Sequence, residues 1–147
     1  MVAPINNLII TGANSPSPIF QFSTPNTDSV TYTIKLRVTD ANGCLDSTQK
    51  DYTVYAQPVA GFNISKRDSC GPLEVNFTNT STSGLSGAGQ GLTYSWHFGN
   101  GITSSKADTS VVFQNNGVRD TTYFVELQVQ NALGCSDTIM DSVVVTP

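Results

Sequence analysis

Charged side chains are scarce in this chain of 147 residues, because Asp, Glu, Lys and Arg together make up only 12%. That is about half the usual share in globular proteins, and serine, threonine and asparagine are left to cover the surface. The net charge of −4 argues against nucleic acid as a partner, since a phosphate-binding face needs clustered lysine and arginine. We therefore expect a β protein whose outer faces show hydroxyl groups to water.

Long apolar runs are missing as well. None approaches the length that a membrane span needs, so we expect no membrane insertion. The start Met1–Pro4 also lacks the basic residues and the apolar stretch of a signal peptide. Two readings stay open, a cytosolic protein or a piece of a larger secreted one, and the second is preferred.

Patterns typical of catalytic and metal sites are also lacking. A single histidine and no cysteine in a reactive setting leave most familiar catalytic triads without a member. Three cysteines without a Cys-x-x-Cys pair argue against zinc. The acidic residues are scattered near expected strand ends, with no pair that would flank the cleft of a glycoside hydrolase. The sequence predicts no enzyme, no catalytic residue, no cofactor and no metal site.

What the sequence does contain is an internal repeat. The segment Tyr32–Cys44 returns without a gap as Tyr123–Cys135, at an offset of 91 residues. Solenoid units run only roughly 20 to 50 residues, whereas a small sandwich domain has about 100. We interpret the chain as part of a tandem array of β domains, in which neighbouring repeats of the same polypeptide are the first partners.

Strict alternation of apolar and polar residues predicts antiparallel strands with one buried face. Both copies of the repeat show it, over residues 32–38 and 123–129. Other short runs of this kind predict strands near residues 60–64, 73–77, 94–98, 111–113 and 143–145. Asn-Gly pairs between the runs suit tight turns. The pattern indicates an all-β, antiparallel, immunoglobulin-like sandwich in tandem repeats.

The boundary between the repeats is expected at the proline-containing linker 56–58. Residues 58–147 would form a complete repeat, and residues 1–57 a partial or divergent one that lacks its opening strands. Projecting the second copy onto the first puts Phe22 in the place of Phe113 and Ile5 in the place of Trp96. Three explanations remain open: an arbitrary boundary of the sequence, a strand supplied by another chain, or a divergent domain that closes differently.

One segment carries a family resemblance. Tyr94–Gly101 resembles the signature of the polycystic-kidney-disease-type (PKD) domain, whose usual form is Trp-Asp-Phe-Gly-Asp-Gly, and Pro72–Ser81 and Tyr123–Val129 are similar to two further strands of that family. The resemblance covers residues 58–147 well, and residues 1–57 only through their later strands. It implies a sandwich of about seven strands in two sheets and export to the cell surface.

The resemblance also assigns roles within the signature. Trp96 and Phe98 are expected to fill the space between the sheets, and Gly99 and Gly101 to permit a sharp turn. His97 stands where the family usually has an aspartate, as does Asn100 in the turn, which weakens the calcium binding that some members show. His97 should point to solvent.

The cysteines give a separate prediction. Cys70 precedes one expected strand and Cys135 precedes the last, so in a sandwich both could lie at the same end. We predict a disulfide between them, which would stabilise the domain by roughly 4 kcal/mol. Cys44, the counterpart of Cys135 in the first copy, is expected to be free. The sequence around Cys70 and Cys135 most resembles repeats of very large surface proteins of Bacteroidota, including gliding-motility adhesins.

The leading hypothesis is a non-enzymatic structural or adhesive spacer repeat of a large secreted cell-surface protein, of the gliding or attachment adhesin type, with surface glycans or other proteins as further partners. The runner-up is a polymer-binding accessory module of a secreted hydrolase. For that reading Phe124 and Tyr55 are the plausible outward aromatic residues. A third hypothesis is a self-assembling filament subunit, in which the open first copy exchanges a strand with a neighbour.

Overall fold

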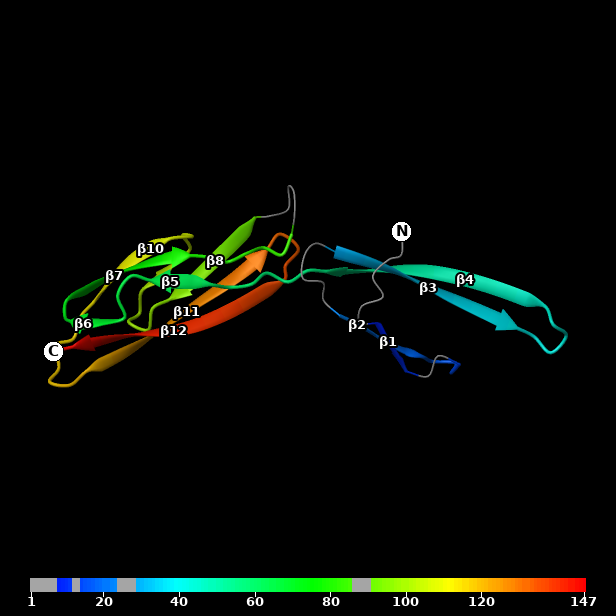
Figure 1. Cartoon of the computed structure of the whole chain (residues 1–147), viewed down its shortest axis with the longest axis horizontal. Helices are drawn as coiled ribbons and strands as arrows, with labels where there is room; N and C mark the ends of the chain where they lie inside the picture. Colours follow the sequence, from blue (N-terminus) through cyan, green and yellow to red (C-terminus); the bar gives the residue numbers. More distant parts are fainter. Residues whose placement is uncertain (1–7, 12–13, 24–28, 86–90) are drawn as a thin grey trace. The chain divides into compact units, whose positions relative to one another are not determined.

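The computed structural model describes residues 8–11, 14–23, 29–85 and 91–147. The chain separates into two compact units, unit 1 (Met1–Ala56) and unit 2 (Gln57–Pro147), drawn in Figure 1. In the described ranges there is no helix that could cross a membrane. Ile5, expected in the place of Trp96, lies outside them.

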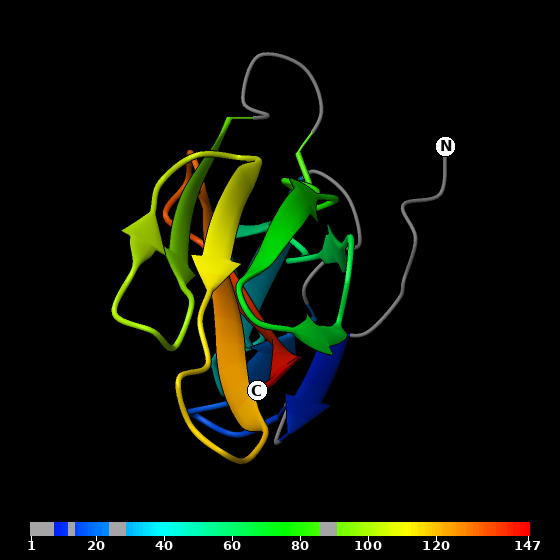
Figure 2. The same cartoon turned by 90° about the vertical axis from the view of Figure 1, so that its left-hand side faces the viewer.

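Unit 2 is a sandwich of two sheets. The larger sheet has the strand order β6 (Asp68–Cys70), β12 (Ser136–Thr146), β11 (Thr121–Asn131), β8 (Leu92–His97), β9 (Thr103–Ser104). The smaller has the order β10 (Thr109–Phe113), β7 (Leu73–Asn79), β5 (Phe62–Ile64). In Figure 2, β10 (yellow) and β7 (green) lie side by side, as their pairing requires. All neighbours are antiparallel except β6 and β12, which are parallel.

The core of unit 2 lies between these sheets, because alternate residues of the strands point inward. Burial alternates with exposure along most of β7, and toward the C-terminal end of β11. Each large apolar side chain buried in this way contributes roughly 1.5–3 kcal/mol relative to an exposed one. The most deeply buried members are Val75, Phe77, Trp96, Phe98, Phe113, Val125, Leu127, Val129, Val143 and Val145. The predicted all-β sandwich is confirmed.

Unit 1 consists of two hairpins. One pairs β1 (Leu8–Thr11) with β2 (Ile19–Phe22), and the other pairs β3 (Ser29–Thr39) with β4 (Leu45–Tyr55). The hairpins meet through aromatic rings, since the Phe22 ring lies 4.9 Å from Tyr32 and 6.0 Å from Tyr52. Unit 1 therefore has a second layer over β3 and β4, but a small one.

Candidate functional site: the signature turn and the repeated hairpin

Strand β8 carries Trp96 into the centre of the unit 2 core, where its side chain has no exposed surface. The indole stacks on Phe98 at 5.7 Å with an interplanar angle of 8°, and it lies 5.0 Å from Phe62 and 5.7 Å from Phe77. Its N–H donates a hydrogen bond of 2.9 Å to the carbonyl of Lys106, so its polar atom is satisfied. This arrangement holds the two sheets together and leaves no face of the indole for a ligand.

The turn after β8 needs its two glycines for different reasons. Both have positive φ, 71° at Gly99 and 87° at Gly101, which costs other residues strain. A Cβ at Gly99 would also lie 2.8 Å from the carbonyl oxygen of Phe124, whereas one at Gly101 would meet open space. Asn100 closes the turn by accepting the N–H of Ile102 at 3.0 Å. Gly99 therefore sets the close approach of this turn to β11.

The polar residues of the signature face outward or stay within the turn. His97 is exposed, and the side-chain oxygen of Asn100 is used by the backbone of its own turn. Among the residues that the structure describes, no group of three or more His, Cys, Asp or Glu is placed to hold a metal ion.

The predicted disulfide between Cys70 and Cys135 is wrong. Cys70 pairs with Thr146 at the C-terminal end of β12, whereas Cys135 directly precedes the N-terminal end of the same strand. An eleven-residue strand spans about 35 Å, far beyond the roughly 7 Å between Cα atoms that a disulfide tolerates. All three cysteines are free, with Cys44 and Cys70 exposed. The error came from the assumption that both residues lie at one end of the sandwich.

The repeated segments form hairpins with the same register. Tyr32 lies opposite Tyr52, and its counterpart Tyr123 lies opposite Val143. Each pair of the β11–β12 ladder has its counterpart in the β3–β4 ladder at the same offset of 91 residues. The internal repeat is therefore a repeat of structure as well as of sequence.

The turns of these hairpins match bond for bond. The carboxylate of Asp40 accepts the N–H groups two and four residues later, at 2.9 and 2.8 Å. Asn131 does the same with its amide oxygen, at 3.1 Å in both cases. A glycine with positive φ follows in each turn, Gly43 at 87° and Gly134 at 82°. The turn chemistry fixes the register of each hairpin locally.

The layer opposite the hairpin is also partly repeated. Phe113 lies 5.0 Å from Tyr123, and in unit 1 the counterpart pair of Phe22 and Tyr32 is 4.9 Å apart. Strand β2 thus takes the place of β10, and β1 pairs with β2 as β7 pairs with β10. No strand in the described part of unit 1 takes the place of β8.

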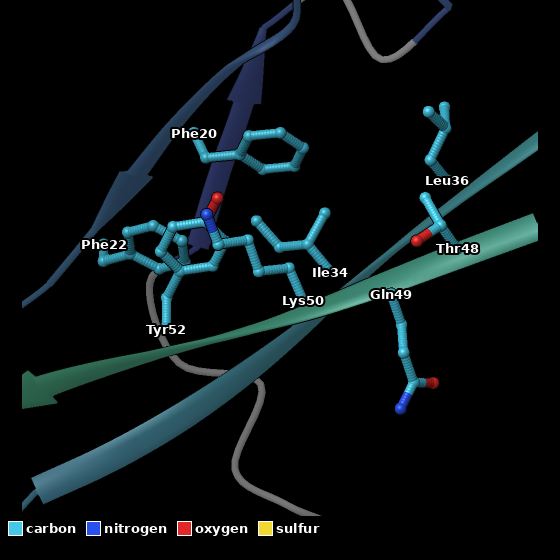
Figure 3. A pocket seen from close by; sticks show the side chains of 8 residues that line it. All are labelled: Phe20, Phe22, Ile34, Leu36, Thr48, Gln49, Lys50 and Tyr52. Carbon is cyan, nitrogen blue, oxygen red and sulfur yellow. The ribbon is translucent and has the colours of Figure 1, made fainter.

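This difference changes the exposure of equivalent residues. Leu127 and Val129 have no exposed surface, whereas their counterparts Leu36 and Val38 are 56% and 52% exposed. Among the described residues, no strand covers Leu36 and Val38 on the side where β8 covers their counterparts. Figure 3 shows Leu36 standing apart from the Phe20 ring. Both residues line a hollow of about 470 Å³. The hollow has the following lining: Phe20, Phe22, Ile34, Leu36, Thr48, Gln49, Lys50 and Tyr52.

A single ion pair occurs among the described residues, between Arg67 and Asp141 of unit 2. The hydrogen bond from the guanidinium lowers the pKa of the Asp141 carboxyl, with burial opposing. It raises the pKa of Arg67 in turn. The pair joins β12 to the loop before β6, next to the bond from the Val144 N–H to the Arg67 carbonyl at 2.8 Å.

The comparison with protein families agrees with the signature. Residues 55–146 match the PKD domain family. The crystal structure of the PKD1 domain of Vibrio anguillarum Epp is 29% identical in sequence and has a TM-score of 0.47. The match covers 61% of this chain and 94% of that domain's chain. The PKD1 domain from the Vibrio cholerae metalloprotease PrtV is 31% identical, with coverage of 62% and 99% and a TM-score of 0.48.

A third solved structure comes from work on the promiscuous specificity of carbohydrate-binding modules of the β-sandwich superfamily. It is 25% identical in sequence and has a TM-score of 0.49. The match covers 61% of this chain and 34% of the chain in that structure. No curated protein matches the chain. PKD domains are in general non-catalytic accessory modules. With the family match extending over more than half of its residues, the chain belongs to the PKD domain family.

Proposed function

We propose that this chain is a structural spacer from a large secreted cell-surface protein, of the gliding or attachment adhesin type found in Bacteroidota. In this proposal residues 58–147 form one complete PKD-type repeat, and residues 1–57 form a partial or divergent repeat that lacks its opening strands. Its work is mechanical, because each sandwich acts as a rigid bead that holds a distal binding region away from the cell.

The observation that carries this proposal is where the polypeptide enters and leaves unit 2. Near the entrance, the N–H of Ala60 donates a hydrogen bond of 2.8 Å to Asp137, at the start of β12. The chain leaves after Thr146, at the other end of the same strand. The entrance and exit are therefore separated by the length of β12, about 35 Å. A domain with its ends at opposite poles lengthens an array by its full long axis.

The pairing of β6 with β12 suits such a role. The two strands run parallel, with Asp68–Cys70 beside Val144–Thr146. Pulling the entrance and exit apart therefore slides β6 along β12, so the ladder is loaded in shear and its hydrogen bonds resist together. The N–H of Gly71 donates to the Thr146 carbonyl at 3.0 Å, and Arg67 adds its ion pair.

Force spectroscopy on the whole chain, held at its two ends, tests the mechanical role. Unit 2 should open in one step that releases about 30 nm of chain. Arg67→Ala should lower the force of that step, and Lys66→Ala, its exposed neighbour, should leave it unchanged. A gradual extension without a step for unit 2 contradicts the proposal. A parent reading frame with a hydrolase domain next to this segment, rather than further repeats, contradicts the spacer role in particular.

The polymer-binding alternative has one observation in its favour. The two aromatic residues expected to face outward do so, with Phe124 61% and Tyr55 45% exposed. They belong to different units, so neither unit offers the pair as one platform. A pull-down with insoluble polysaccharides separates the hypotheses: retention that is lost in Phe124→Ala supports the module, and no retention supports the spacer.

A further inference from the structure

We propose that the edge of β3 opposite β4, which pairs with no described strand, is an acceptor for one extended strand of another polypeptide, which adds antiparallel to residues Lys35–Asp40. The donor strand has aromatic residues at alternate positions and acidic residues between them. This inference does not depend on the spacer role, because strand addition at unit 1 involves no residue of the β6–β12 ladder.

The first argument is the occupied edge in unit 2. There β8 pairs antiparallel with β11, with Trp96 opposite Leu127 and Tyr94 opposite Val129. The hairpins share their register, so Leu36 and Val38 of β3 are the counterparts of those two β11 residues. The unit 2 edge thus shows which side chains this surface accommodates: two aromatic residues two positions apart.

The second argument is the state of the edge itself. Strand β3 pairs with β4 alone in the described residues, and an unpaired edge presents a row of backbone donors and acceptors to an incoming strand. Leu36 and Val38, each more than half exposed, lie along this edge. Backbone pairing would supply affinity here, and the two side chains would supply selectivity.

The third argument is charge. Lys35 and Arg37 stand at the positions of Glu126 and Gln128, which in unit 2 face His97 and Ser95 of β8. On β4 they lie opposite Gln49 and Ser47, and neither forms an ion pair with a described residue. Acidic residues on the outward side of a donor strand would stand opposite both cations, whereas basic residues there would be repelled.

The hollow beside Leu36 completes the acceptor. Phe20 of β2 and Ile34 of β3 are among the apolar residues that line it. The Lys50 amine, also in the lining, lies 5.5 Å from the centre of the Tyr52 ring. An aromatic side chain placed opposite Leu36 would point into this hollow, as Trp96 points into the core of unit 2. Burial of such a ring against aromatic neighbours favours large aromatic residues over aliphatic ones.

A labelled synthetic peptide tests the proposal. Its sequence is that of residues 92–98 with Ser95→Glu and His97→Glu, and its fluorescence anisotropy is followed as the whole chain is added. We expect saturable binding. The peptide with Ser95→Lys and His97→Lys should bind at least about tenfold more weakly, and the peptide with Tyr94→Ser and Trp96→Ser should not bind measurably. Hydrogen exchange should slow between Lys35 and Asp40.

Two chain variants locate the site. Leu36→Gln should weaken binding at least about fivefold, and Met140→Gln, which replaces a similarly exposed residue of β12 (60%), should not. The double variant Lys35→Glu with Arg37→Glu should reverse the preference toward the lysine peptide. Absence of saturable binding, or binding insensitive to Leu36→Gln, overturns the proposal. So does a dimer in sedimentation that Leu36→Gln abolishes, because the edge is then taken by a second copy.

Discussion

The β3–β4 hairpin of unit 1 and the β11–β12 hairpin of unit 2 share their register, their turn and the contact of a tyrosine with an opposing phenylalanine. They differ in what covers them. Leu127 is fully buried, while its counterpart Leu36 is more than half exposed. The comparison teaches that the repeated sequence specifies the hairpin by itself, whereas burial depends on β8, which unit 2 alone shows among the described residues.

The largest expected difference between the units is in the cost of truncating these leucines. Leu127→Ala should lower the unfolding free energy of unit 2 by about 2–5 kcal/mol, because it opens a cavity in a closed core. Leu36→Ala should cost unit 1 less than about 1 kcal/mol, since water already reaches its side chain. Denaturant unfolding, followed by Trp96 fluorescence for unit 2 and by resolved NMR signals for unit 1, measures both. Equal costs would mean that Leu36 is covered in solution.

A second pair of substitutions tests the signature turn of unit 2, which has no counterpart among the described residues of unit 1. Gly99→Ala should destabilise unit 2 by about 3 kcal/mol or more, because strain at positive φ adds to a 2.8 Å contact with backbone. Gly101→Ala, with the same strain and open space, should cost only about 1 kcal/mol. Thermal unfolding of the two variants gives the difference. Equal effects would show that β11 can move away from the turn.

The hairpin turns should respond more alike. Asp40→Ala removes two hydrogen bonds in unit 1, each worth about 0.5–1.5 kcal/mol. Asn131→Ala removes the equivalent two in unit 2, and also the bond that its buried amide donates to the Ser83 carbonyl at 3.3 Å. We expect Asn131→Ala to cost somewhat more, and Asp40→Asn to be nearly neutral. Chemical denaturation checks the order, and a large effect of Asp40→Asn would contradict the shared turn chemistry.

The smallest effect concerns the ion pair between Arg67 and Asp141 of unit 2. Unit 1 has no equivalent pair, because the counterpart of Asp141 is Lys50. The pKa of Asp141 is lowered by Arg67, so this stabilisation is present above the unfolded-state pKa of about 3.9 and is lost as pH falls through the folded-state pKa. Asp141→Asn should therefore be slightly less stable than the parent chain at neutral pH. The two should converge as the pH falls through the folded-state pKa of Asp141. Unfolding midpoints across this range measure the effect, and a gap that persists in acid would assign it to packing.

Much of the fold could be predicted because its signals are local. Alternation along residues 123–129 and the Asn-Gly turns predict strands and hairpins without reference to distant residues. Strand β6 could not be found in this way, because Asp68–Cys70 has no alternation and is held by the far end of the chain. The same missing information produced the wrong disulfide. The length of β12 was also missed, since Ser136–Met140 becomes a strand through its pairing with β11.

In the candidate site, too, local features could be predicted from the sequence and features that depend on distant residues could not. The signature residues Trp96, Phe98, Gly99 and Gly101 could be named from the sequence because they match a family motif that lies within one strand and its turn. An open first repeat was among the sequence-based hypotheses, but its assignment to the edge of β3 needed the structure, because only the pairing of the described strands shows which edge has no partner. Comparison of equivalent positions in the two hairpins was the signal that pointed to it.

Amide hydrogen exchange on the intact chain tests the central claim most directly, because it compares equivalent residues in one sample. In the monomer without a donor strand, the amides of Glu126 and Gln128, which face β8, should exchange only as unit 2 unfolds. Those of Lys35 and Arg37, which face away from β4, should exchange orders of magnitude faster. Equal, slow exchange at both pairs of positions would contradict an open edge in unit 1.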